Sequence, residues 1–255
     1  MTTSLSPMTT VEARALFGAS EPVAILQPVG SVEPHGPHLP LGTDTIISEA
    51  AAEQAAHALT ARGIAARVAP AIPYGVTDFA AGFAGAISVP AAALTAFLRE
   101  IVRAHLTAGA AHVCLVNNHL EPAHDAAVRA AIVDFERSKA SVACPLDRRW
   151  ARTLDAEFKS GACHAGSYET SLVMAAAPTL VREEARRALE PVPISLSTGI
   201  KAGLVTFLAM GLEEAYAGDP ASASSEHGHT QLTLLAAMVE ATVFEALRGG
   251  GDDVR

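Results

Sequence analysis

The chain has 255 residues, half of them hydrophobic and 5% aromatic, and its formal net charge at pH 7 is −9. An acidic chain lacks the basic face that nucleic acids and anionic membranes attract, so neither is expected as a partner. The length suits one hydrophobic core, and we expect residues 1–255 to form a single domain. Three dispersed cysteines (Cys114, Cys144 and Cys163) form no CxxC motif, which favours a reducing, cytoplasmic location.

Apolar runs alternate with helical patterns along the first 146 residues. Strands are expected at 22–30, 64–72, 111–118 and 141–146, and helices at 44–63, 90–109 and 121–139. Further helices are expected at 167–178 and 231–248, and segment 199–229 between them should supply loops near a site. No uncharged apolar stretch reaches the ~20 residues that cross a bilayer. Alternating strands and helices predict a mostly parallel central sheet covered on both faces.

Polar residues gather in three places where ligands bind in such sheets, beyond the carboxyl ends of strands. The first is the loop "SVEPHGPHLPLGTD" (31–44), which contains Glu33, His35, His38 and Asp44. The second is "NNHLEPAHD" (117–125), with His119, Glu121, His124 and Asp125. The third is "CHAGSYETS" (163–171), with His164 and Glu169.

The spacing within the first two clusters predicts a metal centre. Glu33 and His35 are two residues apart, as are His119 and Glu121. Side chains at i and i+2 of an extended chain point the same way, so each pair can aim a carboxylate and an imidazole at one point. With Asp44 as a shared carboxylate, the five ligands suit two divalent ions of the zinc or manganese type. The set contains no thiolate, which excludes a structural zinc finger.

Simpler interpretations exist for several of these residues. Asp44 could be the N-cap of the helix that follows it, and Glu169 could only complement a helix dipole. Cys163 beside His164 could form a nucleophile and base, although adjacent residues rarely orient in that way. His57, His105 and His112 are expected to be surface or packing residues.

His164 and Glu169 lie five residues apart, which would place them about 140° apart on one continuous helix. We therefore expect Gly166 to break the chain between them. His164 would then come from a loop and Glu169 from the first turn of the next helix.

The segment "PVGSVEPHGPHLPLGTDT" (28–45) resembles the hallmark of the creatininase family, the creatinine amidohydrolases and their relatives. The resemblance continues, in order, through "IPYGVTDFAAGFAGAISV", "LVNNHLE", "HAGSYETS" and "GDPASASSEHG". It implies a three-layer α/β/α fold, a homohexamer and a binuclear centre of Zn²⁺ or Mn²⁺, with Fe²⁺ as a further candidate. The implied activity is hydrolysis of a C–N bond in a small, cyclic amide or lactam by a metal-bridging hydroxide.

The resemblance also implies roles for individual residues. Asp44 would bridge the two ions, Glu33 and His119 would complete one metal site, and His35 and Glu121 would complete the other. His164 and Glu169 would face the substrate and transfer protons between the nucleophile and the leaving nitrogen.

Departures from the family pattern concern the substrate. His119-Leu120-Glu121 resembles the creatininase branch, whereas mycofactocin precursor peptidases and formylaminopyrimidine deformylases read H-G-G-N. Creatininases carry lid tryptophans, but this chain has only Trp150. Different pocket walls on a shared centre predict an amide other than creatinine. Peptide or formamide hydrolysis at the same centre, or a metal-binding protein without catalysis, are the alternatives.

Overall fold

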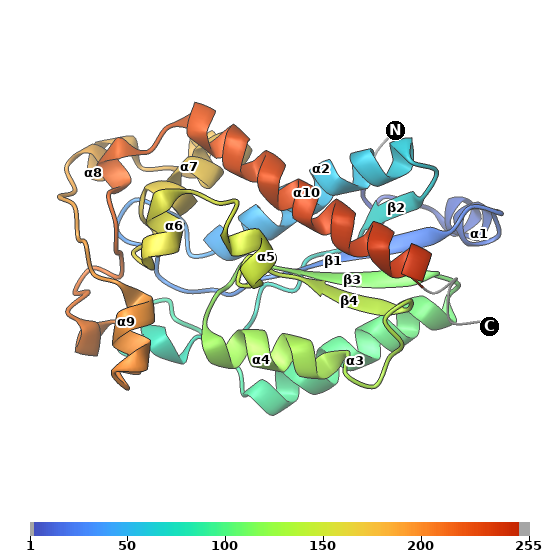
Figure 1. Cartoon of the computed structure of the whole chain (residues 1–255), viewed down its shortest axis with the longest axis horizontal. Helices are drawn as coiled ribbons and strands as arrows, with labels where there is room; N and C mark the ends of the chain where they lie inside the picture. The colour runs from blue at the N-terminus through green and yellow to red at the C-terminus, as the bar shows by residue number, and fades with distance from the viewer. Residues whose placement is uncertain (1–2, 250–255) are drawn as a thin grey trace.

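A parallel four-stranded sheet forms the centre of the protein in a computed structural model that describes residues 3–249 (Figure 1). Its order is β2-β1-β3-β4. The strands are β1 (Val23–Val29), β2 (Ala65–Val68), β3 (His112–Asn117) and β4 (Ala140–Ala143). The predicted domain of residues 1–255 extends beyond the described residues at both ends and stays a prediction.

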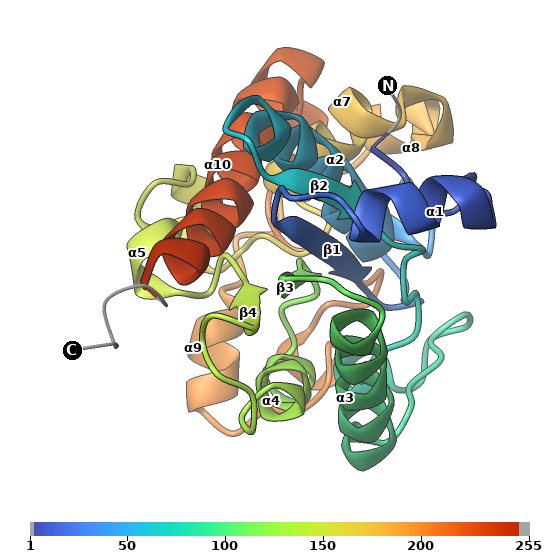
Figure 2. The ribbon, with the colours of Figure 1, turned by 90° about the vertical axis from the view of Figure 1, so that its right-hand side faces the viewer.

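Helices cover both faces of this sheet, which confirms the three-layer α/β/α prediction (Figure 2). Alternate strand residues face opposite layers, as the twofold repeat of a strand requires. Ala24 and Leu26 pack with α2 (Thr43–Ala61), α7 (Ser167–Ala176) and α10 (Ser225–Gly249). Ile25 and Val29 pack with α1 (Thr10–Phe17), α3 (Ala91–Thr107) and α4 (Pro122–Ala131).

Short helices gather beyond the carboxyl ends of the strands, at the left of Figure 1. They are α6 (Ala156–Ser160), α8 (Glu183–Arg187) and α9 (Leu196–Lys201), while α5 (Arg148–Ala151) lies nearer the sheet. The 3₁₀ turns are Asp78–Ala80, Pro178–Leu180, Leu208–Met210 and Pro220–Ser222. A third apolar cluster, which includes Ala80, Phe207 and Leu212, fills the space among these turns. This end of the sheet is where the predicted site residues lie.

The sequence pattern locates the four strands and the main helices, but the bounds of several elements differ from it. The helix predicted at 121–139 ends at Ala131, and the residues that follow form turns in which Val133 is exposed. The strands predicted at 64–72 and 141–146 are shorter, at four residues each. Apolar residues that continue the pattern of a strand or helix can thus lie in the loop that follows it.

The last helix, α10, begins at Ser225, six residues before the predicted start at 231. Glycine, serine and aspartate in segment 199–229 suggested loops, but Gly228 lies where α10 meets α7. A Cβ at Gly228 would stand 1.8 Å from the carbonyl oxygen of Ser171, so the glycine permits the close approach of two helices. By length and composition α10 could cross a membrane. In this structure its apolar face, with Leu235 and Val239, packs in the core.

The close contact at Gly228 gives a prediction about stability. Gly228→Ala should force α10 away from α7 and cost about 1–3 kcal/mol, as overpacking usually does, which lowers the melting temperature by several degrees. Gly249→Ala is the matched control, because it lies on the same helix with no atom within 4 Å of its added Cβ. Thermal melts of the two variants check this. An unchanged melting temperature for Gly228→Ala would contradict the tight packing.

Candidate metal centre

The seven residues predicted from the sequence are all buried, and they lie together at the carboxyl ends of β1 and β3. They are Glu33, His35, Asp44, His119, Glu121, His164 and Glu169. Their ligand atoms form three overlapping groups in which all such atoms lie within 4.8 Å of one another. The groups are Glu33 with His35 and His164, Glu33 with His119 and Glu121, and His35 with Asp44 and Glu169.

The loop from β1 to α2 presents three of these residues. Gly30 begins it so close to α2 that a Cβ there would stand 2.6 Å from the amide nitrogen of Thr45. Farther along, the amide of Glu33 donates to the carbonyl of Leu41 across the loop (3.1 Å). Asp44 is not the helix N-cap, because Gly42 occupies that position and Asp44 lies buried in the first turn. The capping interpretation of Asp44 is therefore wrong.

Each of the three histidines donates one ring N–H to a backbone carbonyl. His35 donates from Nδ1 to Glu33 (3.1 Å), His119 from Nε2 to Val76 (2.7 Å), and His164 from Nε2 to Pro34 (3.0 Å). A carbonyl oxygen can only accept, so these bonds set which nitrogen remains for another partner. Metal-binding histidines are oriented by bonds of this kind.

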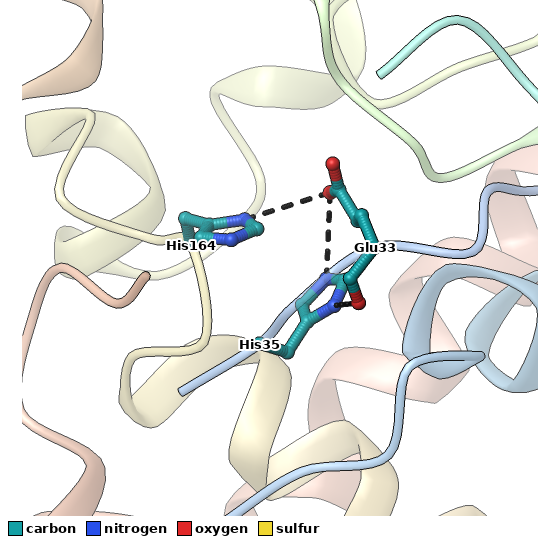
Figure 3. Close-up of side chains that lie close together, drawn as sticks. All are labelled: Glu33, His35 and His164. Atoms are coloured by element: carbon teal, nitrogen blue, oxygen red, sulfur yellow. Dashed lines mark hydrogen bonds and ion pairs between the residues drawn. The ribbon is translucent and has the colours of Figure 1, made fainter. Parts of the chain in front are cut away.

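The remaining nitrogen of each histidine faces one oxygen of Glu33. The distances to Oε1 are 3.7 Å from Nε2 of His35, 3.3 Å from Nδ1 of His119 and 3.8 Å from Nδ1 of His164. Figure 3 shows His35 and His164 turned toward this carboxylate from two sides. The other oxygen, Oε2, accepts a hydrogen bond from the hydroxyl of Thr77. Glu33 is therefore held in place at the centre of the cluster.

Asp44 lies between two of the histidines. Its Oδ1 is 3.1 Å from Nε2 of His35, and its Oδ2 is 3.0 Å from Nδ1 of His119. Each carboxylate oxygen thus belongs to a different side of the cluster, which is the arrangement that a shared ligand requires.

Glu121 and Glu169 belong to different ligand groups, and these groups differ from the ones that the resemblance implies. Glu121 lies with Glu33 and His119, whereas Glu169 lies with His35 and Asp44. Both oxygens of Glu121 accept backbone N–H groups, from Asp78 and Phe79 (3.1 Å each). The family pattern instead pairs Glu121 with His35, so the geometry favours a different division of the ligands.

The third cluster is built as expected around Gly166. Gly166 is the N-cap residue of α7, Glu169 lies in its first turn, and His164 precedes the helix. Oε2 of Glu169 accepts the N–H of Ala165 (2.7 Å) and lies 3.7 Å from Nε2 of His35. The prediction that Gly166 separates a loop with His164 from a helix with Glu169 is confirmed.

Burial and mutual contact shift the pKa values of these groups strongly. Burial by itself lowers the pKa of His35, but Asp44, Glu169 and Glu33 outweigh it and raise the pKa to about 10. Burial raises the pKa of Glu33, but His119 outweighs it and, with His164, lowers the pKa to about 2. Burial raises the pKa of Glu169 to about 8 and that of Glu121 to about 7.

These residues fit divalent metal ions. Four buried carboxylates lie together, and within residues 3–249 no lysine or arginine forms a salt bridge with any of them. Within residues 3–249, Oδ2 of Asp44 has no polar partner besides Nδ1 of His119 (3.0 Å). Buried charges are costly unless they are paired or bind metals, so positive charge is needed here. Imidazole and carboxylate donors suit zinc and manganese.

Other residues of the three clusters lie outside the metal groups. His124 packs edge-on against His119, with ring centroids 4.6 Å apart, and its Nδ1 accepts the N–H of Val76 (3.2 Å). Asp125 forms an ion pair with Arg129 (2.9 Å). Burial raises the pKa of Cys163 well above its ordinary value, which speaks against a thiolate nucleophile beside His164.

A cavity of about 200 Å³ opens above the cluster. Its apolar lining includes Phe79, Leu120, Leu146, Phe158, Leu196, Ile200 and Phe207. Phe207 stacks on His164 with ring centroids 4.3 Å apart. The sequence indicated loops near the site in segment 199–229, and Ile200 and Phe207 come from it. It did not single out Phe79 or Phe207, since no local pattern distinguishes a lining phenylalanine from a core one.

Comparisons with known proteins agree with the fold and with the family that the sequence resembles. The profile of the creatininase family, described as creatinine amidohydrolase, matches residues 6–243. A mycofactocin precursor peptide peptidase of Mycobacterium tuberculosis is 32% identical over 232 residues, with 88% of this chain and 85% of that protein covered. One from Mycolicibacterium smegmatis is 31% identical over 207 residues, with 80% and 77% covered.

Solved creatininase structures share the fold. One superposes with a TM-score of 0.77 at 22% identity, covering 96% of this chain and 98% of that chain. A manganese form of creatininase superposes with a TM-score of 0.73 at 21% identity, covering 97% and 99%. The family profile and the relatives support a hydrolase, and the clustered ligand atoms support metal binding. The chain belongs to the creatininase family, as the sequence pattern predicted.

The pKa values predict how the metal-free protein responds to pH. His35 and Glu169 titrate near pH 10 and pH 8 in the folded protein, above their ordinary values of 6.5 and 4.5. His38, His124 and His164, whose pKa values are lowered, are neutral in both states above about pH 7.5. Above that pH the folded state therefore holds more protons than the unfolded state, and the free energy of unfolding should fall as the pH rises further. Bound zinc replaces the protons and should make the decline smaller.

Thermal melts at about pH 7.5, 8.5 and 9.5, with and without zinc, measure this dependence. A metal-free protein that becomes more stable over this range would contradict the electrostatic description of the cluster.

Proposed function

We propose that this protein is a two-metal amidohydrolase that hydrolyses a C–N bond in a small amide with an apolar substituent. The observation that carries the proposal is the arrangement around Glu33. Three buried histidines, each anchored to a backbone carbonyl, turn their second nitrogen toward one carboxylate below an apolar cavity.

The geometry supports a specific division of ligands between the two ions. Glu33 and His119 would hold one ion, and His35 and Glu169 would hold the other. Asp44 would bridge them, since its two oxygens face different histidines. Zn²⁺ and Mn²⁺ are the ions proposed, and solved creatininases include a manganese form and a Zn–Zn form. Such ions supply Lewis-acid chemistry, polarising a carbonyl and bringing the pKa of water toward ~7.

Glu121 and His164 are the proposed proton-transfer residues. Both line the cavity. The two amide bonds to Glu121 fix its carboxylate, and its pKa of about 7 suits a general base near neutral pH. Glu121 would accept the proton of the attacking water. His164, held between the rings of His35 and Phe207 with its pKa lowered to about 4 by burial, would take this proton from Glu121 at its free Nδ1 and pass it to the leaving nitrogen, which departs poorly as an amide anion.

The cavity supports an apolar substrate rather than creatinine. Trp150 does not line it, and phenylalanine, leucine and isoleucine side chains form much of its wall, beside the polar Lys159 and Ser197. A second candidate is hydrolysis of a peptide bond, which the similarity to mycofactocin precursor peptide peptidases favours. The hexameric assembly and the cytoplasmic location stay predictions.

Two isosteric variants separate the roles of the two glutamates. Glu169→Gln should lower the metal content from about two ions per chain to about one, because it removes a charged ligand. Glu121→Gln should keep two ions but lower kcat by roughly 10²–10⁴, the usual contribution of a positioned acid–base group. Elemental analysis and steady-state kinetics measure both, with exposed Glu245→Gln as the control. Metal loss in Glu121→Gln with full metal in Glu169→Gln would reverse the assignment.

The apolar walls predict substrate preference in the metal-loaded enzyme. An amide with a leucine-sized substituent should exceed its unsubstituted parent by about 10- to 100-fold in kcat/KM. Burying an apolar group of this size contributes about 1.5–3 kcal/mol of free energy. A panel of lactams, acyl amides, formamides, short peptides and creatinine tests this. A creatinine kcat/KM at or above ~10⁴ M⁻¹s⁻¹, which is typical of an enzyme on its own substrate, would refute it.

A further inference from the structure

Two buried residues outside the metal groups, His38 and Thr170, connect the loop between β1 and α2, called the metal loop below, to α7. Nε2 of His38 lies 2.8 Å from the hydroxyl of Thr170, although the two are 132 residues apart in the chain. Both side chains are fully buried. Neither belongs to a ligand group or lines the cavity. Their contact therefore needs an explanation other than direct chemistry.

The Thr170 hydroxyl continues this contact to Ala165. It lies 3.3 Å from the carbonyl oxygen of Ala165, which can only accept. A hydroxyl has one hydrogen, so with that hydrogen on Ala165 the bond from His38 must be donated by its Nε2–H. The chain of donors thus runs from His38 through Thr170 to the backbone of Ala165.

Ala165 has an unusual backbone conformation. Its φ angle is +51°, in the left-handed region of backbone conformation that residues other than glycine rarely adopt. Such conformations persist when surrounding contacts impose them, and they gather at functional sites. Here the residue beside His164 is in this conformation, and its own N–H donates to Oε2 of Glu169 (2.7 Å). The turn at Ala165 therefore orients the carboxylate that faces His35.

We infer that His38 and Thr170 are positioning residues that hold the left-handed turn at Ala165 and, through it, the carboxylate of Glu169. This inference rests on the proposed function, in which Glu169 binds one of the two ions. It extends the site to a path from the metal loop, through a neutral imidazole and a hydroxyl, to the first turn of α7.

The inference predicts how zinc affinity responds to removal of the hydroxyl. Thr170→Val keeps the shape of the side chain but removes the hydrogen bonds. It should weaken one of the two zinc ions by roughly 3- to 10-fold, the ordinary effect of one buried hydrogen bond. Thr170→Ser retains the hydroxyl and should stay within about twofold of the natural protein. Zinc titration of the metal-free protein against a chromophoric chelator measures both dissociation constants.

A second substitution distinguishes positioning from simple packing. Glycine adopts the left-handed conformation without strain, so Ala165→Gly should make the hydrogen bonds dispensable. The double variant Thr170→Val with Ala165→Gly should recover the zinc affinity lost by Thr170→Val. If Thr170 only fills space, removal of a further buried methyl group should leave the affinity as low or lower it again, and this result would overturn the inference.

A matched control and a second pair of variants complete the experiment. Thr242→Val makes the same change on α10, where the hydroxyl donates to Met238 (2.8 Å), and should leave zinc affinity unchanged. Should Thr170→Val not fold, His38→Gln retains a donor near the Nε2 position and should bind zinc more tightly than His38→Met. Equal affinities in this pair would also overturn the inference.

Zinc affinity separates this inference from the proposed function. A protein that shows the predicted pattern of zinc affinities but hydrolyses no amide would refute the proposed activity and support the positioning role. An active hydrolase whose Thr170→Val variant binds both ions normally would refute the positioning role alone.

Discussion

Four carboxylates buried at one end of a sheet are the constraint on which the site depends. Glu33 comes from the loop after β1, Asp44 from the first turn of α2, Glu121 from the start of α4 and Glu169 from α7. None is neutralised by a lysine or arginine in residues 3–249. Bringing these charges out of water is unfavourable unless positive charge joins them. In the metal-free protein, protons on His35, His119 and Glu169, whose pKa values are raised, meet this need in part. The same demand for positive charge makes the cluster suitable for divalent ions.

The surrounding chain is organised to hold this cluster rigid. Besides the turn at Ala165, the carboxylate of Glu157 on α6 accepts the amides of Tyr168 and Asp219 (2.8 Å each). A Cβ at Gly166 would stand 2.4 Å from this carboxylate. Glu157 thus fastens the helix that forms part of the cavity wall to the helix that carries Glu169. Ligands held in this way lose little freedom when an ion binds.

The metal cluster and the cavity wall have different origins in the structure. The cluster lies on the ends of β1 and β3 and on α7, which belong to the layered core. The wall comes largely from short helices and turns between residues 146 and 207. For this chain the apolar wall is the feature that bears on substrate.

The sequence by itself determined the layered fold, the family and the identity of the clustered residues. Strand alternation and helical periodicity are local, and the two-residue spacing of Glu33 with His35 and of His119 with Glu121 is local as well. For this reason these features can be found without a structure. The start of α10 was missed because Gly228 serves a contact with another helix, which no local pattern contains.

Only the tertiary structure decided which residues meet. Glu121 groups with His119 and Glu169 with His35, although spacing and family resemblance allowed another division. The bonds from His164 to Pro34 and from His38 to Thr170 each span at least 130 residues. Such contacts depend on how α7 packs against the loop after β1. The physical reason is that side-chain periodicity sets the direction of a residue within its own element, whereas the distance between elements is set by the packing of the whole core.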